Sequence, residues 1–226
     1  MSGRGWAGTT LAGRRADRHQ RLLDVGLELL GTQGSAAVSV RSVCRAAQLT
    51  DRYFYESFAD REALVRTVYD GVAAQAREVL IAAVAGCGSD EPHRVATAAV
   101  EAFVELITAD PRKGRVLLLE PQSDPALNVR GAAVAPAFEE IIRAQLGDSD
   151  AMDARLTAAA LVGALANLFV RWLDGTLAVE RAVLTQYCVR LLVASRELVE
   201  PLSSASRTRR AGVALRADRR RHGGRR

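Results

Sequence analysis

The stretch from Ser39 to Leu64 constrains the fold more than any other part of this chain, because its residues predict three short helices separated by two tight breaks. Ser39 precedes apolar residues that recur on one helical face, so its hydroxyl is expected to cap the first helix. Those apolar residues are Val40, Val43 and Ala47. Gln48 and Leu49 interrupt the pattern, which predicts that this helix ends there.

The second helix is predicted to begin at Thr50, a second capping residue, and to continue to Glu56. A helix of about seven residues rises only about 10 Å and is not stable alone. Phe54 and Phe58 are therefore expected to hold it against its neighbours. Asp60 is expected to cap a third helix, so that the short helix is clamped on both sides.

The face of the second helix opposite the two phenylalanines is predicted to carry polar side chains. They are Arg52, Tyr53 and Glu56, with Thr50 and Asp51 at the helix N-terminus. A short, firmly held helix with an exposed polar face is typical of a helix-turn-helix DNA-binding unit. Arg52 fits either guanine O6 and N7 or a phosphate, and Asp51 fits either base contact or stabilisation of its own helix. A compact helical hairpin with no role in nucleic-acid binding is the alternative.

These residues resemble those of a known protein family. Residues 47–58 (AQLTDRYFYESF), followed by residues 60–64 (DREAL), resemble the N-terminal domain of TetR-family (tetracycline-repressor-like) transcriptional regulators. An upstream amphipathic helix matches the first helix of that family, and the similarity spans about residues 15 to 70. The apolar residues of that helix include Leu22, Leu23, Leu29 and Leu30.

The resemblance implies a repressor that binds double-stranded DNA and is released by a small molecule, and it implies a phosphate contact for Tyr55. The chain departs from the family pattern at three positions: Gln48 replaces the usual glycine of the turn, and Asp51 and Arg52 replace a lysine and a glycine. These departures affect which operator sequence the protein would recognise, and not its assignment to this class of regulator. The predicted DNA-binding residues are Ser39, Arg41, Thr50, Asp51, Arg52, Tyr53, Tyr55 and Glu56.

The remainder of the chain predicts long helices joined by short polar breaks, so the fold class is all-α: a three-helix DNA-binding domain followed by a larger helical effector-binding and dimerisation domain. The low aromatic content of 5% also favours helix over sheet. The predicted domains are a flexible basic arm (1–14), a helix-turn-helix domain (15–66), the larger domain (67–200) and a disordered Arg-rich tail (201–226). The later helices are expected at about 60–85, 91–109, 112–120, 125–146, 151–174 and 179–199.

The last two of these helices predict a homodimer. The helix at 151–174 is apolar around most of its circumference, so it must be covered from several sides. Small residues would let a second helix approach closely, and the final helix offers further apolar side chains. Pairing of these helices from two chains in a four-helix bundle would give a symmetric dimer and hence a near-palindromic operator. One domain covering the helix alone is the alternative.

An effector pocket is expected inside the larger domain, with a mainly apolar lining that suits a hydrophobic or amphipathic molecule. The candidate lining residues are Phe103, Leu106, Leu117, Leu118, Phe138, Asn167, Phe169, Arg171 and Trp172. Asn167 lies within the most apolar helix, where it fits either a satisfied core or interface amide or an effector contact.

Charge is divided unevenly along the chain. Residues 1–66 carry a net charge of +3, residues 67–200 carry −6 and residues 201–226 carry +8. A basic DNA-proximal domain and an acidic distal domain would orient the molecule on a polyanion. The tail either adds salt-sensitive affinity for DNA or has no defined role.

The sequence offers little for an enzyme, a metal site or a cofactor. Its three cysteines and three histidines are scattered without ligand spacing, and no nucleophile elbow or phosphate-binding glycine loop is present. We expect a cytoplasmic protein, because the N-terminus lacks a signal-like apolar core and the longest apolar run is too short to cross a bilayer. Two alternatives to an effector-released repressor are a small-molecule carrier with a vestigial helix-turn-helix and a redox-sensing regulator acting through Cys44.

Overall fold

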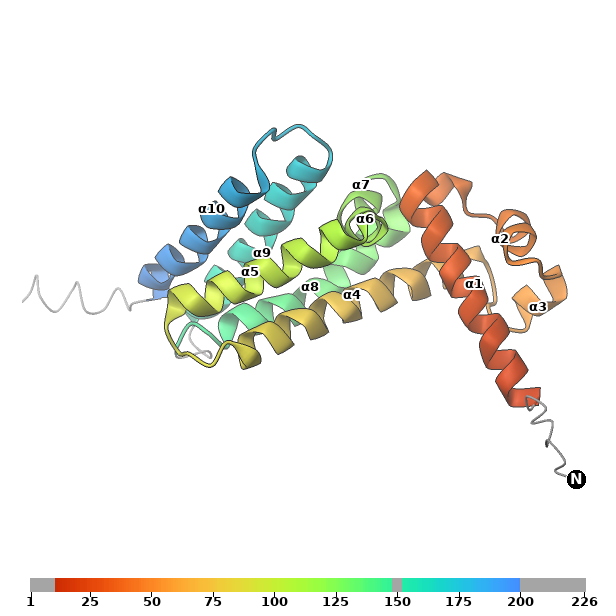
Figure 1. Ribbon diagram of the computed structural model, residues 1–226, viewed down its shortest axis with the longest axis horizontal. Helices are drawn as coiled ribbons and strands as arrows, with labels where there is room; N and C mark the ends of the chain where they lie inside the picture. Colours follow the sequence, from red (N-terminus) through yellow and green to blue (C-terminus); the bar gives the residue numbers. More distant parts are fainter. Residues whose placement is uncertain (1–10, 148–151, 200–226) are drawn as a thin grey trace, which may run out of the picture.

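Residues 11–147 and 152–199 are described by the computed structural model, in which an N-terminal helical domain adjoins a larger helical domain (Figure 1). All elements of this described part are helical, as the sequence predicted. They are α1 (Leu11–Gln33), η1 (Ser35–Ala37), α2 (Val40–Ala47), α3 (Asp51–Tyr55), α4 (Arg61–Gly86), α5 (Pro92–Ala109), α6 (Pro111–Gly114), η2 (Arg115–Leu119), α7 (Glu120–Ser123), α8 (Pro125–Arg143), α9 (Met152–Leu173), α10 (Arg181–Ala194) and η3 (Ser195–Val199).

The boundaries follow the chemistry of the helix ends. Ser39 and Asp60 cap α2 and α4 through their side chains, and prolines stand at the first turn of α5, α6 and α8. Thr50 occupies the N-cap position of α3, but its side chain makes no capping hydrogen bond, contrary to the prediction. The start of α3 is fixed instead by the Thr50 carbonyl, which accepts from the amides of Tyr53 and Phe54.

The N-terminal domain consists of α1, α2, α3 and the first part of α4. Helix α4 continues into the larger domain, so the predicted boundary at residue 66 falls inside one unbroken helix. Helix α1 begins at Leu11, four residues inside the segment expected to be a flexible arm. The rest of that arm and the Arg-rich tail at 201–226 lie outside the described residues.

The larger domain packs α4, α5, α8, α9 and α10 around an apolar core (Figure 1). Helix α5 contacts α4 and α10, while α8 contacts α4 and α9. The segment predicted as one helix at 112–120 is instead α6, the π-helical η2 and α7. These short elements lie where the two domains meet, because α6 and η2 both contact α1.

Helix α9 is the one described helix whose length and hydropathy would suit a membrane crossing. Within the larger domain it packs against α8, η2 and η3. Its outer face, however, is exposed in the single chain, including Leu156 at 61%. Within the single chain α9 is therefore covered on its inner face but not on its outer face, whereas the sequence predicted that it must be covered from several sides.

Candidate DNA-binding surface and ligand cavity

The turn before α3 is built by α2 and its two ends. The Ser39 hydroxyl accepts from the amide of Ser42 at 3.0 Å, and the Ser42 hydroxyl accepts from the Ser39 amide at 2.9 Å. At the other end Gln48 adopts the left-handed conformation, with φ at 54°. The Leu49 amide then donates to the Cys44 carbonyl at 2.9 Å. Together these bonds fix the direction in which the chain enters α3.

Helix α3 is held by aromatic packing, as predicted. Phe54 is fully buried and Phe58 is nearly so, with their ring centroids 5.8 Å apart. His19 of α1 stacks on Phe58, with a centroid distance of 4.7 Å. A helix of five residues has little stability of its own, so these rings determine its orientation.

The outer face of α3 is open to a ligand. The Arg52 side chain is 84% exposed and Tyr55 is 60% exposed. Thr50 and Asp51 at the helix N-terminus are exposed as well. Ser39 and Arg41 at the start of α2 are also exposed, although the Ser39 hydroxyl is occupied by its capping bonds.

Glu56 and Tyr53 are less available than the sequence suggested. The Glu56 carboxylate lies 3.1 Å from the Arg52 guanidinium and 3.8 Å from that of Arg18. The Arg18 guanidinium also stands over the Tyr53 ring, 4.4 Å from its centroid. Glu56 therefore partly neutralises two arginines, and Tyr53 supports one of them.

Sequence reasoning missed the contribution of α1 to this surface. Arg15 donates to the Glu56 carbonyl at 3.0 Å, and Arg18 belongs to the same helix. Arg15 is the first residue of the predicted helix-turn-helix domain, and the N-terminal part of α1 places it beside α3. The three- and four-residue spacing of Arg14, Arg18 and Arg21 was the available signal.

Cys44 is poorly suited to sensing oxidants. It is only 4% exposed. Burial, together with the hydrogen bond to Asp51 and the charge of that residue, raises the pKa of the Cys44 thiol to about 11. Because the thiolate is the reactive form, a thiol with this pKa is almost entirely unreactive near neutral pH. The redox alternative therefore loses its physical basis.

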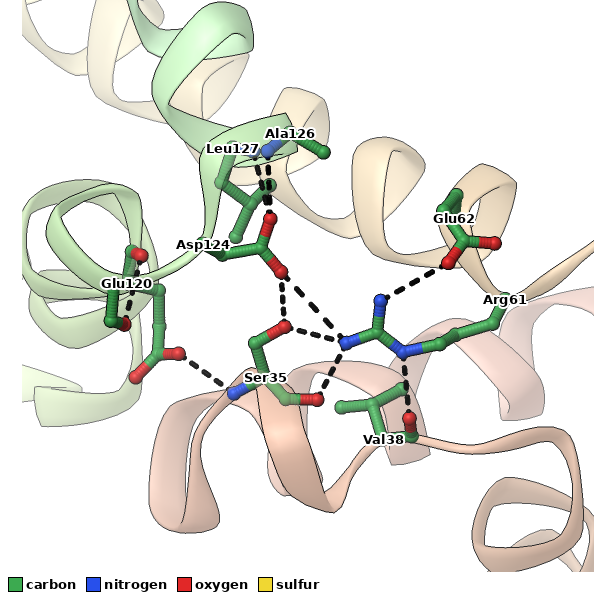
Figure 2. Close-up of polar contacts among 9 residues, drawn as sticks. Ser35, Val38, Arg61, Glu62, Glu120, Asp124, Ala126 and Leu127 are labelled. Atoms are coloured by element: carbon green, nitrogen blue, oxygen red, sulfur yellow. Dashed lines mark hydrogen bonds and ion pairs between the residues drawn. The ribbon is translucent and has the colours of Figure 1, made fainter.

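A partly buried polar network, which we call the polar junction, links the two domains. It comprises Ser35, Arg61, Arg115, Glu120 and Asp124, most of which are drawn in Figure 2. The Ser35 amide donates to the Glu120 carboxylate at 2.7 Å, and the Ser35 hydroxyl donates to the Asp124 carboxylate. Arg61 donates to the Ser35 carbonyl at 2.6 Å, and Arg115 donates to Glu120 at 2.8 Å.

Asp124 serves both the junction and its own helix. Its carboxylate accepts from the Ala126 and Leu127 amides at the start of α8 (Figure 2). Burial opposes ionisation of Asp124, but the Ser35 and backbone hydrogen bonds prevail and hold its pKa below the usual value. A shift of η1 relative to α8 would therefore break charged hydrogen bonds, which couples the positions of the two domains.

Close packing of α1 on α6 adds to this coupling. A Cβ atom at Gly31 would lie 2.8 Å from the Arg112 Cα, so only glycine permits this approach. The Arg112 guanidinium also contacts the Glu28 carboxylate of α1 at 2.7 Å.

The larger domain contains a cavity of about 380 Å³ between α4, α5, η2, α7, α8, α9 and α10. Five of the nine predicted pocket residues line it: Phe103, Leu117, Leu118, Phe138 and Phe169. The other four, Leu106, Asn167, Arg171 and Trp172, do not line this cavity. Asn167 and Arg171 are exposed on the outer face of α9, whereas the Trp172 indole donates to the Val179 carbonyl at 3.0 Å.

Comparison with known proteins agrees with this architecture. Residues 22–68 match the model of the family "Bacterial regulatory proteins, tetR family". Among curated proteins, none matches the chain significantly. The helix-turn-helix domain joined to a larger helical domain is the layout of a transcriptional regulator. Over residues 22–68, in its N-terminal domain, the chain therefore resembles the TetR family of DNA-binding regulators.

Solved structures share the fold at low sequence identity. The regulator FadR of Bacillus subtilis in complex with stearoyl-CoA has 16% identity and a TM-score of 0.65, over 78% of this chain and 98% of that one. A TetR-like regulator from Rhodococcus sp. RHA1 has 20% identity and a TM-score of 0.61, over 82% and 98%. The multidrug-binding protein EbrR, complexed with imidazole, has 20% identity and a TM-score of 0.61, over 84% and 97%. The matched family consists of regulatory proteins, which agrees with the prediction that the chain is not an enzyme.

Proposed function

We propose that this chain is a cytoplasmic, homodimeric repressor that binds a near-palindromic operator through α3 and is released when a mainly apolar molecule occupies the cavity. The observation that carries this proposal is the exposed Arg52 and Tyr55 face of α3, on a domain matched to a family of DNA-binding regulators. The polar junction connects that domain to the cavity-containing domain.

On DNA, α3 would enter the major groove. Arg52, with its long and exposed side chain, reaches either guanine or a phosphate, while Tyr55 is suited to a phosphate. Arg41, at the start of α2, and Arg15 and Arg18 of α1 would contact the flanking backbone. Asp51, which lies beside the Cys44 thiol, stabilises the N-terminus of α3 in preference to base readout.

Dimerisation is supported by the exposed face of α9 and α10. Leu156 of α9 and Val183 and Tyr187 of α10 are large side chains that remain at least about half exposed in the single chain. Between them α9 exposes the small residues Ala159, Ala160 and Gly163. A second copy packed here would bury this face and present two α3 helices about 34 to 36 Å apart, or at a comparable multiple-turn spacing.

Release by an effector is supported by the elements that the cavity and the junction share. Leu117 and Leu118 of η2 line the cavity, and Glu120 of the next turn binds Ser35. A ligand that displaces η2 and α7 would disturb η1 and hence the spacing of the two α3 helices. Such release is a population shift, which requires the ligand to favour the arrangement that does not fit DNA. Relatives with the same fold were solved with stearoyl-CoA or imidazole bound, consistent with small-molecule regulation.

The test is selection of bound sequences from a random duplex DNA pool by the full chain at near-physiological salt. The proposal predicts enrichment of a near-palindrome, and the double variant Arg52→Ala, Tyr55→Ala should lose this enrichment while remaining dimeric. Salt-sensitive binding without sequence enrichment would contradict the proposal. If ligand binding to the cavity persisted in that case, the carrier alternative would take its place.

A further inference from the structure

The side chains that line the cavity carry no charge in the described part of the chain. Twenty of the 23 lining residues are apolar, and no Asp, Glu, Lys, Arg or His is among them. The three exceptions are Tyr69, Gln122 and Asn128. A charged ligand inside such a lining would lose its hydration without gaining a counter-charge. The lining therefore selects against ions.

Tyr69 is the polar group that lies deepest in this lining. The residue is only 2% exposed, and among the described residues no group forms a hydrogen bond with its hydroxyl. Because no fully buried side-chain N or O atom in this part of the chain lacks a partner, the Tyr69 oxygen must itself be accessible from the cavity. The oxygen lies 3.2 Å from where a Cβ of Gly131 would stand, so it packs directly against α8 at the cavity wall. A hydroxyl that is open to a cavity and has no partner within the protein is available to form a hydrogen bond with a ligand.

The surroundings keep Tyr69 a neutral donor. Burial and the neighbouring Asp70 raise the pKa of its hydroxyl to about 12, with Arg130 opposing them. Asp70 and Arg130 are paired with each other at 2.6 and 2.9 Å, so neither is free to bind a ligand charge. The group offered to a ligand is therefore one phenolic O–H.

The polar and apolar lining residues occupy different ends of the cavity. Gln122 follows Glu120 on α7 and Asn128 lies one turn after Asp124 on α8, so both stand beside the polar junction. Leu80, Ile141 and Leu192, from the later parts of α4, α8 and α10, line the other end. A ligand that matches this gradient has one polar end and an apolar body.

We propose that the cavity binds an uncharged amphiphile, whose apolar body fills the space between α5, α8 and α9 and whose oxygen acceptor receives a hydrogen bond from Tyr69. Carboxylates, phosphates and ammonium ions are excluded. This inference rests on the proposed function only in treating the cavity as the effector site. At about 380 Å³, the cavity is within the range of about 300–1,000 Å³ that is typical of small-molecule sites.

The experiment uses the full chain without DNA and the fluorescence of bound N-phenylnaphthylamine, an uncharged reporter. Methyl decanoate, decanoate and decyltrimethylammonium, each below its micelle concentration, compete for the site at pH 7.5. We expect the ester to displace the reporter and the two ions to be at least about a hundredfold weaker. Leu165→Trp, which fills the cavity, should abolish binding of the reporter and of all three competitors.

The Tyr69→Phe variant tests the hydrogen bond. It should lower the affinity for methyl decanoate about tenfold, the loss expected for one hydrogen bond. The affinity for naphthalene, an apolar competitor without an oxygen acceptor, should stay unchanged. Thr97→Val is the matched control, since it removes a hydroxyl that bonds only within α5, outside the cavity. Equal binding of the ester and the ions, an unchanged ester affinity in Tyr69→Phe, or no reporter binding by the wild type would each overturn the inference. Because DNA is absent, failure of the proposed repressor function would be seen separately, as a DNA pool without an enriched palindrome.

Discussion

At the scale of single residues, Glu56 partly neutralises the positive charge of the proposed DNA-binding surface. Its carboxylate lies between Arg52 and Arg18, and its carbonyl accepts from Arg15. An acidic side chain on a DNA-facing surface either contacts a base, such as cytosine N4, or restrains neighbouring cations. The ion pairs favour restraint of the arginines.

We therefore predict that Glu56→Gln strengthens DNA binding a few-fold at near-physiological salt, because it frees the two guanidinium groups for phosphates. The effect should be equal for operator and unrelated duplexes, as measured by fluorescence anisotropy over a range of salt concentrations. A loss of operator affinity of more than about tenfold, without change for other sequences, would show instead that Glu56 reads a base.

Gln48 is a second residue with a specific physical role. It is the one non-glycine residue with positive φ in the described part of the chain, and it ends α2. Left-handed backbone is costly for residues that carry a Cβ atom.

Gln48→Gly is accordingly expected to raise the free energy of unfolding by about 0.5–1 kcal/mol, measured by urea denaturation. Gln48→Ala serves as the control, since it keeps the Cβ atom and should give no such gain. A lower stability of Gln48→Gly than of the wild type would mean that the Gln48 side chain contributes more than its backbone strain costs.

At the scale of elements, the sequence predicted most helix boundaries because they depend on local chemistry. Asp60 and Pro125 mark helix starts that can be recognised without knowing the fold. The segment 112–120 was predicted as a single helix because the π-helical turn of η2 has no local signal. That turn packs against α1, α4 and α9, all distant in sequence.

The cavity could be predicted only in part for a similar reason. Phe103 and Phe169 pack against each other at its wall, with ring centroids 5.0 Å apart, and their size made them recognisable. Helix α9 is apolar nearly all round, so periodicity does not indicate which face is internal. For this reason the sequence did not reveal that Asn167 and Arg171 lie on the outer face of α9. Trp172 bonds instead to the segment that connects α9 and α10.

The junction between η1 and α8 gives a prediction for stability. Asp124→Ala removes the cap of α8 and the partner of the Ser35 hydroxyl, so it should lower the free energy of unfolding by about 2 kcal/mol at neutral pH. Asp174→Ala is the control, because that carboxylate caps a turn at Thr176 without joining the two domains. Asp174→Ala should lower the free energy of unfolding by less than Asp124→Ala does.

The effect of Asp124 should depend on pH. Because its folded-state pKa is depressed, its stabilisation is present above the unfolded pKa of about 3.9 and is lost as pH falls through the folded value. The difference between wild type and Asp124→Ala, measured by urea denaturation, should therefore shrink below about pH 4. A difference that is constant from neutral to acidic pH would contradict the role given to the ionised carboxylate.

At the scale of the whole molecule, the proposed binding to a near-palindromic operator requires two chains. Gly163 lies on the exposed face of α9, and a Cβ atom there would meet nothing within 4 Å in the single chain. Gly163→Arg should therefore fold normally but dissociate the dimer, as seen by sedimentation velocity, and lose operator binding.

Gly71→Arg is the matched control, since Gly71 is also helical, exposed and free of neighbours within 4 Å. This variant should remain dimeric. A dimeric Gly163→Arg protein would remove the α9 face from the interface.

The most direct test of the account is the affinity of the full chain for its selected operator with and without methyl decanoate bound in the cavity. If occupancy of the cavity is coupled to the position of α3 through the polar junction, the bound ester should weaken operator binding at least about tenfold. The operator should weaken ester binding by the same factor, because thermodynamic coupling is reciprocal. Operator affinity that stays unchanged while the ester is bound would contradict the account.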